Sequence, residues 1–393
     1  VTYRLRPGSA GRAARLQGIV DGCRFTWNAV LGETRDATRA RSLGAPVPPV
    51  STTFFTFSGR FTRLRAEHPR LETLPFHVVR YTLKRQSDAW SRYYSGTGQR
   101  PRFKSRHRDG GFTIPGDVRI DGDLLTIPGS RSCRGFRVRL CRRNEPKVMG
   151  DPVQVVVRQA FGRWYATVFY RVAVEPVPDN GIAIGIDLNH AARAVACSTG
   201  EIVSFPDTER LEARKRRYQR RISLNRRGSM KRGSKRRARM KRRLSKTCRK
   251  LANVRSNWQH QTSRALADTA GQVCYEDLKV GAMSTKGRGK RGLNRENLRV
   301  GWRGLRTKIE YKAAVATAVA QHWTSQTCSK CGSRGERSGE SFRCGCGHRA
   351  HADLNAARNV LASGSGATGR GEALALATST IRQWTVRVDR VPN

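Results

Sequence analysis

The chain has 393 residues, and its 77 lysines and arginines against 29 acidic residues give a formal net charge of +48 at pH 7. The length suits two or three domains, and a hydrophobic share of 37% allows a sizeable core. We find no apolar run of the roughly 20 residues that span a membrane and no secretion-signal pattern, so we expect a cytoplasmic bacterial protein. The charge predicts a nucleic-acid partner, although a non-specific basic binder would satisfy it equally well.

The first part of the chain is predicted to be helical. Apolar residues recur at three- and four-residue spacing over 13–40, and two further helices are expected near 58–68 and 76–95. Residues 96–111 form a basic stretch rich in turn-forming residues. We expect three of its side chains to contact nucleic acid: Arg102, Lys104 and Arg106.

Residues 112–175 change to the alternating pattern of β-strands. One hairpin is predicted around Asp121 and Gly122, and a second has its turn at 161–163. Pro176 and Pro178 follow and indicate a domain boundary. We therefore expect a small β module, formed as a barrel, at this point.

The chain after residue 181 alternates between strands and helices. Apolar segments predict strands at 181–187, 193–199, 201–205 and 272–278. About half of the residues from 209 to 250 are Lys or Arg. Such a run is often a solvated face, but its first part also carries apolar residues, so we favour a helical hairpin with one side facing phosphates. The expected contacts there include Arg216, Arg217 and Arg220.

Further helices and a tail complete the predicted elements. An amphipathic helix is expected over 251–266, another over 302–320 and a third from 352. The tail from 363 begins with Gly and Ser and is predicted to be flexible.

Three acidic residues stand where a phosphodiester-cleaving site would need them. Asp187 and Glu276 each end an apolar strand, and Asp353 opens a helix. Carboxylates gathered in this way repel one another, and hard divalent cations such as Mg²⁺ or Mn²⁺ relieve that repulsion. A pair of ions can then activate water and stabilise the leaving oxygen of a phosphodiester. Asp277 is the alternative to Glu276, which we prefer because Tyr275 and Asp277 should share the opposite strand face.

Four of the ten cysteines form the second chemical signal. Cys328 and Cys331 form a C-x-x-C turn, and Cys344 and Cys346 follow with one intervening residue where two are usual. This pattern predicts a structural zinc ribbon in a reducing compartment. The short second pair leaves His348 or His351 as possible replacement ligands, and four reactive or buried thiols without a metal are the alternative interpretation.

These motifs resemble those of the TnpB family of transposon-encoded nucleases and of the related compact type V CRISPR effectors. The similar segments cover most of the chain to about residue 362. They include GIDLN at 185–189, YEDL at 275–278, TSQTCSKCG at 324–332 and ADLNAARN at 352–359. Asn189, His351 and the short second cysteine pair depart from the family pattern.

The resemblance implies a multidomain α+β fold. Its parts would be a β-barrel wedge domain (1–12 and 112–178), an inserted helical recognition lobe (13–111) and a ribonuclease H-like, RuvC-type α/β nuclease domain (181–362). A zinc ribbon at 324–350 would be inserted in the last of these, and a flexible tail would occupy 363–393.

The resemblance also implies an activity. A guide RNA would select double-stranded target DNA, and a two-metal endonuclease site built from Asp187, Glu276 and Asp353 would cut it. One structural Zn²⁺ would bind at the four cysteines, and Arg358 and Asn359 would support the site. A nuclease-inactive RNA-guided repressor and a guide-independent RuvC-like resolvase or transposase are the alternatives.

Overall fold

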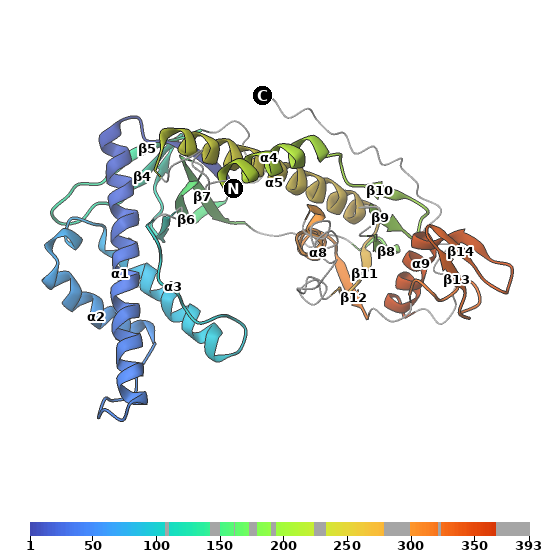
Figure 1. Cartoon of the computed structure of the whole chain (residues 1–393), viewed down its shortest axis with the longest axis horizontal. Coiled ribbons are helices and arrows are strands. Elements are labelled where there is room, and N and C mark those ends of the chain that lie inside the picture. The colour runs from blue at the N-terminus through green and yellow to red at the C-terminus, as the bar shows by residue number, and fades with distance from the viewer. Residues whose placement is uncertain are drawn as a thin grey trace. The chain divides into compact units, whose positions relative to one another are not determined.

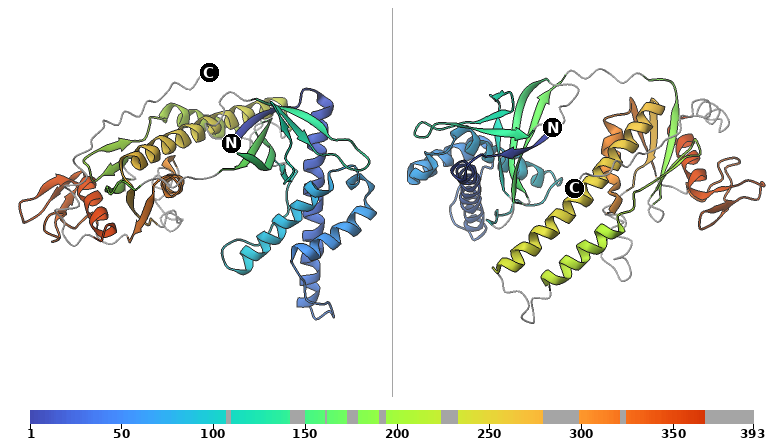
Figure 2. Two further views of the ribbon diagram at one scale, coloured as in Figure 1. Left: turned by 180° about the vertical axis from the view of Figure 1, so that it is seen from behind. Right: turned by 90° about the horizontal axis from the view of Figure 1, so that it is seen from above.

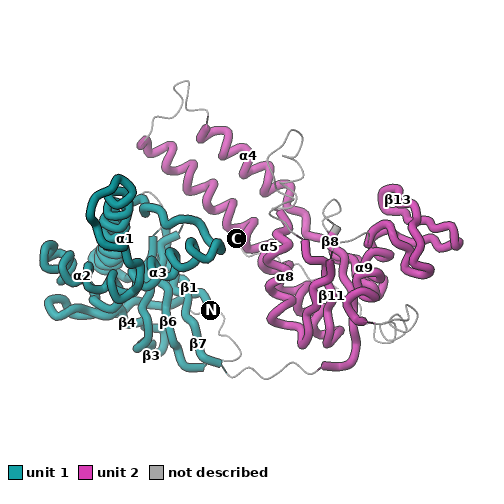
Figure 3. The backbone as a smooth tube through the Cα atoms, turned by 90° about the horizontal axis from the view of Figure 1, so that it is seen from below, with its two compact units in different colours: residues 1–174 teal, residues 175–393 magenta. Residues whose placement is uncertain are grey.

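The computed structural model describes residues 1–106, 110–141, 150–160, 162–172, 179–189, 194–223, 233–278, 299–320 and 324–366. Figure 1 shows the helices and strands that these residues form. The chain divides into two compact units, residues 1–174 and 175–393, which are coloured separately in Figure 3. No helix among the described residues is long and apolar enough to cross a membrane.

The helices of unit 1 confirm the predicted helical N-terminal segment. They are α1 (Ala10–Ser42), α2 (Phe54–Glu67), a 3₁₀ turn (Pro69–Leu71) and α3 (Phe76–Tyr94). Helix α2 begins four residues earlier than predicted. The hydroxyl of Thr53 accepts a hydrogen bond from the backbone N–H of Thr56 and caps the helix there.

A seven-stranded antiparallel sheet completes unit 1, in the order β2-β6-β7-β1-β5-β4-β3. Both predicted hairpins are present, and Gly122 and Gly162 adopt the positive φ angles that their two-residue turns require. The described strand ladders curl without joining β2 to β3 (Figure 2). The strand bounds are β1 Thr2–Arg6, β2 Gly111–Pro115, β3 Ile120–Asp121, β4 Leu124–Ile127, β5 Phe136–Cys141, β6 Asp151–Ala160 and β7 Arg163–Arg171.

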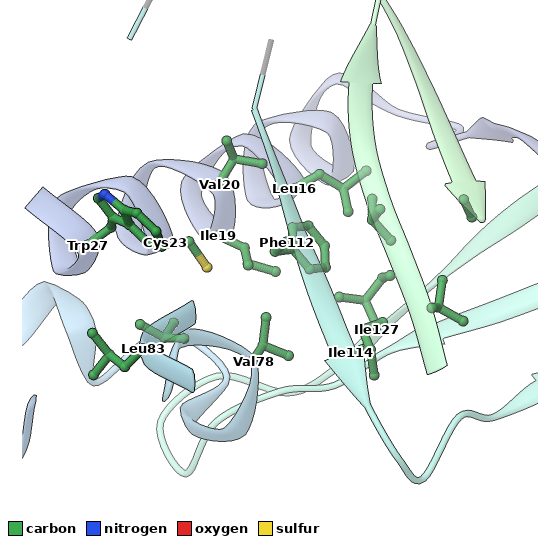
Figure 4. Packing of buried hydrophobic residues seen from close by; sticks show 14 of the residues in the cluster. Leu16, Ile19, Val20, Cys23, Trp27, Val78, Leu83, Phe112, Ile114 and Ile127 are labelled. Atoms are coloured by element: carbon green, nitrogen blue, oxygen red, sulfur yellow. The ribbon is translucent and has the colours of Figure 1, made fainter. Parts of the chain in front are cut away.

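The core of unit 1 lies between these helices and the sheet. Figure 4 shows Leu16 and Ile19 of α1 beside Phe112 and Ile114 of β2, with Val78 of α3 nearby. All five side chains are at most 4% exposed. The three-residue spacing of Leu16 and Ile19 explains why this face of α1 is buried.

Unit 2 is built on a five-stranded mixed sheet in the order β10-β9-β8-β11-β12. The chain forms an antiparallel meander through β8 (Ala183–Asn189), β9 (Ala194–Cys197) and β10 (Ile202–Ser204). Strands β11 (Gln272–Glu276) and β12 (Val315–Val319) then add in parallel beside β8. The four strands predicted from the sequence are therefore confirmed.

Two basic helices form the predicted hairpin. Helices α4 (Glu209–Ser223) and α5 (Lys235–Thr269) pack against each other, and Figure 2 shows them side by side. The second half of α5 packs on α8 (Trp302–Glu310). Trp258 of α5 lies at this junction, edge-to-face with Trp302, and is 1% exposed.

The helix predicted over 302–320 is wrong in its second half. Helix α8 ends at Glu310, and Val315–Val319 forms β12 at the sheet edge. Residues 315, 317 and 319 are Val, Thr and Val, whose branched side chains favour strands. The tail was also placed too early, since α9 (Ala352–Gly364) includes 363 and 364; residues 367–393 lie outside the described part of the chain.

Helix α9 packs directly on the sheet because glycines remove side chains at the contact. A Cβ built on Gly185 of β8 would lie 2.2 Å from the carbonyl oxygen of Ala357 and 2.5 Å from the backbone nitrogen of Leu361. A Cβ on Gly364 would lie 2.5 Å from the Cys274 sulfur. The close approach of β8 and α9 fixes how the start of α9 meets the sheet.

The close approach makes Gly185→Ala destabilising. We expect the free energy of unfolding of unit 2 to fall by about 1–3 kcal/mol, because backbone atoms of α9 cannot move aside cheaply. Urea denaturation of the full chain measures this change. The control is Gly32→Ala in α1, where a Cβ meets nothing within 4 Å. This substitution should raise the free energy of unfolding by about 0.5–1 kcal/mol. An unfolding curve unchanged by Gly185→Ala would contradict the direct helix–strand contact.

Candidate active site and metal centre

Two of the three predicted acids lie on neighbouring parallel strands. Ile186 of β8 pairs in register with Tyr275 of β11, so Asp187 and Glu276 come next along each strand, at the carboxyl end of the sheet. Asp187 is followed by two more residues of β8, whereas Glu276 is the last residue of β11. Open α/β sheets commonly bind ligands at the carboxyl ends of their parallel strands, next to a change in strand direction.

Asp353 reaches the same region from α9. It lies in the first turn of that helix, and the Nδ1 atom of His351 accepts a hydrogen bond of 3.3 Å from its backbone N–H. His351, which departs from the family pattern, therefore caps the helix that carries Asp353. The contact of α9 with β8 at Gly185 brings this helix start to the acids on the sheet.

The three carboxylates are buried and influence one another. Asp187, Glu276 and Asp353 are 8%, 6% and 2% exposed. Burial, and then the charges of Glu276 and Asp353, raise the pKa of Asp187 from 3.8 to about 7. Burial also raises the pKa of Glu276, against the effect of a hydrogen bond from the Thr324 hydroxyl. Hard divalent cations bind carboxylate oxygens and would stabilise the ionised form of these acids.

One residue at this site was missed from the sequence. Arg337 of β13 (Glu336–Ser338) donates a hydrogen bond of 2.8 Å from its guanidinium to Asp353, and its charge also acts to lower the pKa of Asp187. Arg337 lies between the two cysteine pairs, in a stretch with several other arginines. No spacing or motif in the sequence distinguished it from them.

The segment before the cysteines is fastened to the acids and to α9. Thr324 donates a hydrogen bond to the Glu276 carboxylate. The Asn359 amide donates to the carbonyl oxygens of Thr324 and Thr327, at 2.8 and 2.6 Å, and Asn355 also donates to Thr327 at 2.7 Å. Asn359, which the resemblance implied would support the site, therefore holds the segment before the cysteines against α9.

Asp277, the alternative to Glu276, lies in a different environment. Its side chain is 48% exposed and pairs with the Arg306 guanidinium, which also contacts Glu310 at 2.8 Å. The Tyr275 hydroxyl donates to the same Glu310 carboxylate at 3.0 Å. Tyr275 and Asp277 therefore share the face towards α8, as expected from strand alternation, and Glu276 points towards Thr324.

The four cysteines converge in the structure. The sulfur atoms of Cys328, Cys331, Cys344 and Cys346 all lie within 4.8 Å of one another. Cys328 and Cys346 are 3.8 Å apart, and Cys331 and Cys344 are 3.5 Å apart. Four sulfurs held at about 2.3 Å around a tetrahedral zinc would be separated by about 3.8 Å. The geometry therefore fits one metal ion bound by four cysteines.

The convergence bears on the choice of the fourth ligand. Cys346 belongs to the cluster despite its short spacing, so neither histidine is needed to complete four ligands. His348 instead lies 3.5 Å from the Ser329 hydroxyl, and His351 caps α9. The three-stranded sheet of β13, β14 (Ser341–Arg343) and β15 (Arg349–His351) frames the cysteines and leads directly into α9.

The basic residues predicted to contact nucleic acid differ in their surroundings. Arg216, Arg217 and Arg220 are exposed along α4. Arg102 and Arg106 are also exposed, but the Lys104 ammonium lies 3.8 Å from the ring centre of Trp27, and burial lowers its pKa to about 8. The backbone of Lys104 also exchanges two hydrogen bonds with the Asn28 side chain. Lys104 therefore helps to hold this segment on α1.

The raised pKa of Asp187 predicts a pH-dependent gain in stability from Asp187→Asn. With a pKa of about 7 when folded and an ordinary value of 3.8, the carboxyl binds its proton more tightly in the folded state. The wild-type free energy of unfolding should therefore fall as the pH rises from about 4 to 7. In EDTA, the free energy of unfolding of Asp187→Asn should exceed that of the wild type by a few kcal/mol at pH 8 and by much less at pH 5. Urea denaturation at the two pH values measures this difference. An equal difference at both pH values would contradict the raised pKa of Asp187.

Two family models match parts of the chain that carry the residues described above. Residues 302–360 match the model "Cas12f1-like, TNB domain", and residues 165–286 match the model "Probable transposase". The first range contains the four cysteines, Arg337 and Asp353, and the second contains Asp187 and Glu276.

Three curated relatives agree with the models. "Putative RNA-guided DNA endonuclease InsQ" of Escherichia coli (strain K12) is 27% identical over 94% of this chain and 93% of its own length. A "Putative RNA-guided DNA endonuclease" of Streptomyces pristinaespiralis is 27% identical over 75% and 73%. "CRISPR-associated endodeoxyribonuclease Cas12f1" of Sulfoacidibacillus thermotolerans is 30% identical over 53% and 52%. These matches confirm the resemblance to the TnpB family and the compact type V effectors.

The fold agrees as well. It is similar to a chain in the cryo-EM structure of the Cas12f1–sgRNA–target DNA complex, with a TM-score of 0.53 and 15% identity. The similarity covers 88% of this chain and 82% of that one. At this identity the match establishes the fold, which extends across both units.

Proposed function

We propose that this chain is an RNA-guided DNA endonuclease that hydrolyses phosphodiester bonds in guide-matched DNA. The proposal is carried by Asp187, which lies buried at the carboxyl end of a mixed sheet and whose pKa is raised by burial and by the charges of Glu276 and Asp353. The names of the similar proteins support the same activity. Burial and neighbouring charges that raise a carboxyl pKa, as they do for Asp187 to about 7, are typical of functional sites.

We assign a pair of hard cations, Mg²⁺ or Mn²⁺, to the three acids, because carboxylate oxygens are the ligands such ions prefer. When bound, such ions supply an activated water and stabilise the leaving oxygen. The chain's own residues prepare the site for this chemistry. Thr324 orients Glu276, His351 caps the helix of Asp353, and Arg337 places a positive charge at Asp353, where it can also attract a substrate phosphate.

The cysteine cluster fits one structural Zn²⁺. Its four sulfurs leave no open ligand position for a reacting group, so we assign it to stability rather than catalysis. The hydrogen bonds from Asn355, Asn359 and Thr324 join this ribbon to the acids.

We assign the domains as the resemblance implies. The curled sheet of unit 1 corresponds to the wedge domain (1–12 and 112–178), and α1 to α3 correspond to the recognition lobe (13–111). The antiparallel meander extended by two parallel strands suits a ribonuclease H-like, RuvC-type domain (181–362) with its ribbon at 324–350.

Guide RNA and double-stranded DNA are the partners. The net charge of +48 suits a chain that binds two polyanions. The exposed arginines of α4 and of the 101–106 segment offer phosphate contacts, and base pairing between guide and target would supply sequence specificity.

The test is purification with co-expressed flanking RNA, followed by incubation with matched or mismatched duplex DNA and Mg²⁺. Cutting of the matched duplex alone is the expected result. Cutting without RNA would replace the proposal with a guide-independent resolvase. Guided binding of DNA without cutting would replace it with a repressor.

A further inference from the structure

Two lysines at the end of α8 and just after it contact α5 and have no part in the proposed chemistry. Lys308 of α8 donates hydrogen bonds to the Gln259 amide oxygen at 3.0 Å and to the Gly304 carbonyl at 3.3 Å. Lys312 donates to the His260 carbonyl at 2.7 Å and to the Ser263 hydroxyl at 2.8 Å. Each ammonium is therefore held in a fixed place on the surface of α5.

The oxygen atoms that hold these lysines are all uncharged. Among the residues that the structure describes, no carboxylate forms an ion pair with Lys308 or Lys312. The one acid of α8, Glu310, is engaged elsewhere, since it pairs with Arg306 and accepts a hydrogen bond from Tyr275. An ammonium has three N–H donors, and two are used on each lysine, so each keeps one for another acceptor.

The surroundings of the pair favour an anion. Burial, and then the charges of Arg264 and Lys308, lower the pKa of Lys312 to about 8, against an opposing effect of Asp268. Burial also lowers the pKa of Lys308. His260 next to them has its pKa lowered by burial and then by both lysines. These positive groups repel one another, and a bound anion would relieve the repulsion.

We infer that Lys308 and Lys312 form a preformed binding site for the phosphodiester backbone of a nucleic acid. The two free N–H donors can each bind a non-bridging phosphate oxygen, and the side chains lose little freedom because α5 already holds them. The inference rests on the proposed function for its partner class. The same phosphate chemistry belongs to guide RNA and to DNA, and the experiment separates the two.

The competing interpretation is that both lysines only fasten α8 to α5. Under it, removal of their charge would lower stability without a specific effect on phosphate binding. Arg303 provides a matched comparison, because it carries the same charge on the same helix, is exposed, and has no described ion-pair partner. A loss due to net charge alone would be equal for Arg303.

The experiment measures binding of the full chain to labelled RNA, single-stranded DNA and duplex DNA across a KCl series, in EDTA. The variants are Lys308→Gln, Lys312→Gln, the double variant and Arg303→Gln. Each lost phosphate contact should reduce the slope of log affinity against log salt by about 0.9 on duplex DNA or about 0.7 on a single strand. We expect this for Lys308→Gln and for Lys312→Gln, each compared singly, with at least one probe, and a smaller change for Arg303→Gln. The probe that responds identifies the backbone involved.

A footprint on the wild-type chain covers the case in which a variant fails to fold. Acetylation of Lys308 and Lys312, followed by mass spectrometry, should be suppressed by the probe that responds. Equal slopes for the single lysine variants and Arg303→Gln, or lysines that stay equally reactive with every probe, would overturn the inference. These measurements need no cleavage. A chain that binds as expected but does not cut guide-matched DNA would therefore contradict the proposed function and leave the phosphate-binding inference in place.

Discussion

Asp187→Ala is expected to abolish guided cleavage while leaving RNA and DNA binding intact. The fall in the cleavage rate should be about 10³-fold or more, comparable with removing a principal electrostatic group from other active sites. Asp187 is the acid whose pKa is raised by the charges of both of the others, so the proposed cation site should not survive its loss. Single-turnover cleavage of a matched duplex in Mg²⁺, with filter binding of the same duplex, measures both properties.

Asp277→Asn is the matched control for this experiment and for its companion, Glu276→Gln. Asp277 neighbours Glu276 in sequence but is exposed and paired with Arg306 on the other face of β11. We expect Glu276→Gln to behave like Asp187→Ala and Asp277→Asn to cut at close to the wild-type rate. If Asp277→Asn were inactive and Glu276→Gln active, the strand-face argument would be wrong. If Asp187→Ala still cut, the active centre would lie elsewhere in the chain.

Asp187→Ala and Asp187→Asn together separate two roles of one residue. The charge that makes Asp187 useful for cations also makes it costly in the folded chain, because it is buried beside two other carboxylates. If Asp187→Asn folds more stably than the wild type at pH 8 and does not cut DNA, the wild-type residue lowers stability in exchange for activity. Asp277, exposed and already paired, should show neither effect.

The sequence predicted the acids because each lies in a local pattern. An apolar strand before Asp187 and Glu276, and a helix after Asp353, are visible without knowledge of the fold. Local periodicity also gave the hairpin of α4 and α5. By contrast, Arg337 reaches Asp353 only through the fold of the ribbon, and the strand at 315–319, which its branched residues favour locally, also has a parallel partner in β11 that the sequence does not reveal. Contacts between distant segments leave no periodic trace.

Gly185 illustrates a feature that was visible but not interpretable from the sequence. It stands in the GIDLN segment, where a small residue between two isoleucines has no obvious purpose. The structure supplies one, since the backbone of α9 passes where a side chain would be. The same contact brings Asp353 to the sheet. The identity of the three acids was therefore a local property, whereas their meeting depends on this helix–strand contact.

Loss of the cysteine-bound metal should disable the acids, although no cysteine contributes to them. Cys328→Ser is expected to remove one metal ion per chain, to lower the thermal stability of the ribbon and to reduce guided cleavage severely. Structural zinc contributes on the order of 10 kcal/mol to the folding of small domains. Three contacts transmit the loss to the acids: Thr324 to Glu276, Arg337 to Asp353, and Asn359 to the segment before Cys328. Metal analysis by mass spectrometry, thermal unfolding and single-turnover cleavage would be measured on one preparation.

Cys248→Ser is the control, because Cys248 lies in α5, outside the four-cysteine cluster. It should keep its metal, its stability and its activity. His348→Ala tests the ligand set further, since a metal held by four sulfurs should survive loss of this imidazole. If Cys328→Ser lost its metal and still cut DNA at the wild-type rate, the ribbon would be independent of the acids. The hydrogen bonds that join Thr324, Arg337 and Asn359 to the site would then have no part in catalysis. Helix α9 alone would have to keep Asp353 buried.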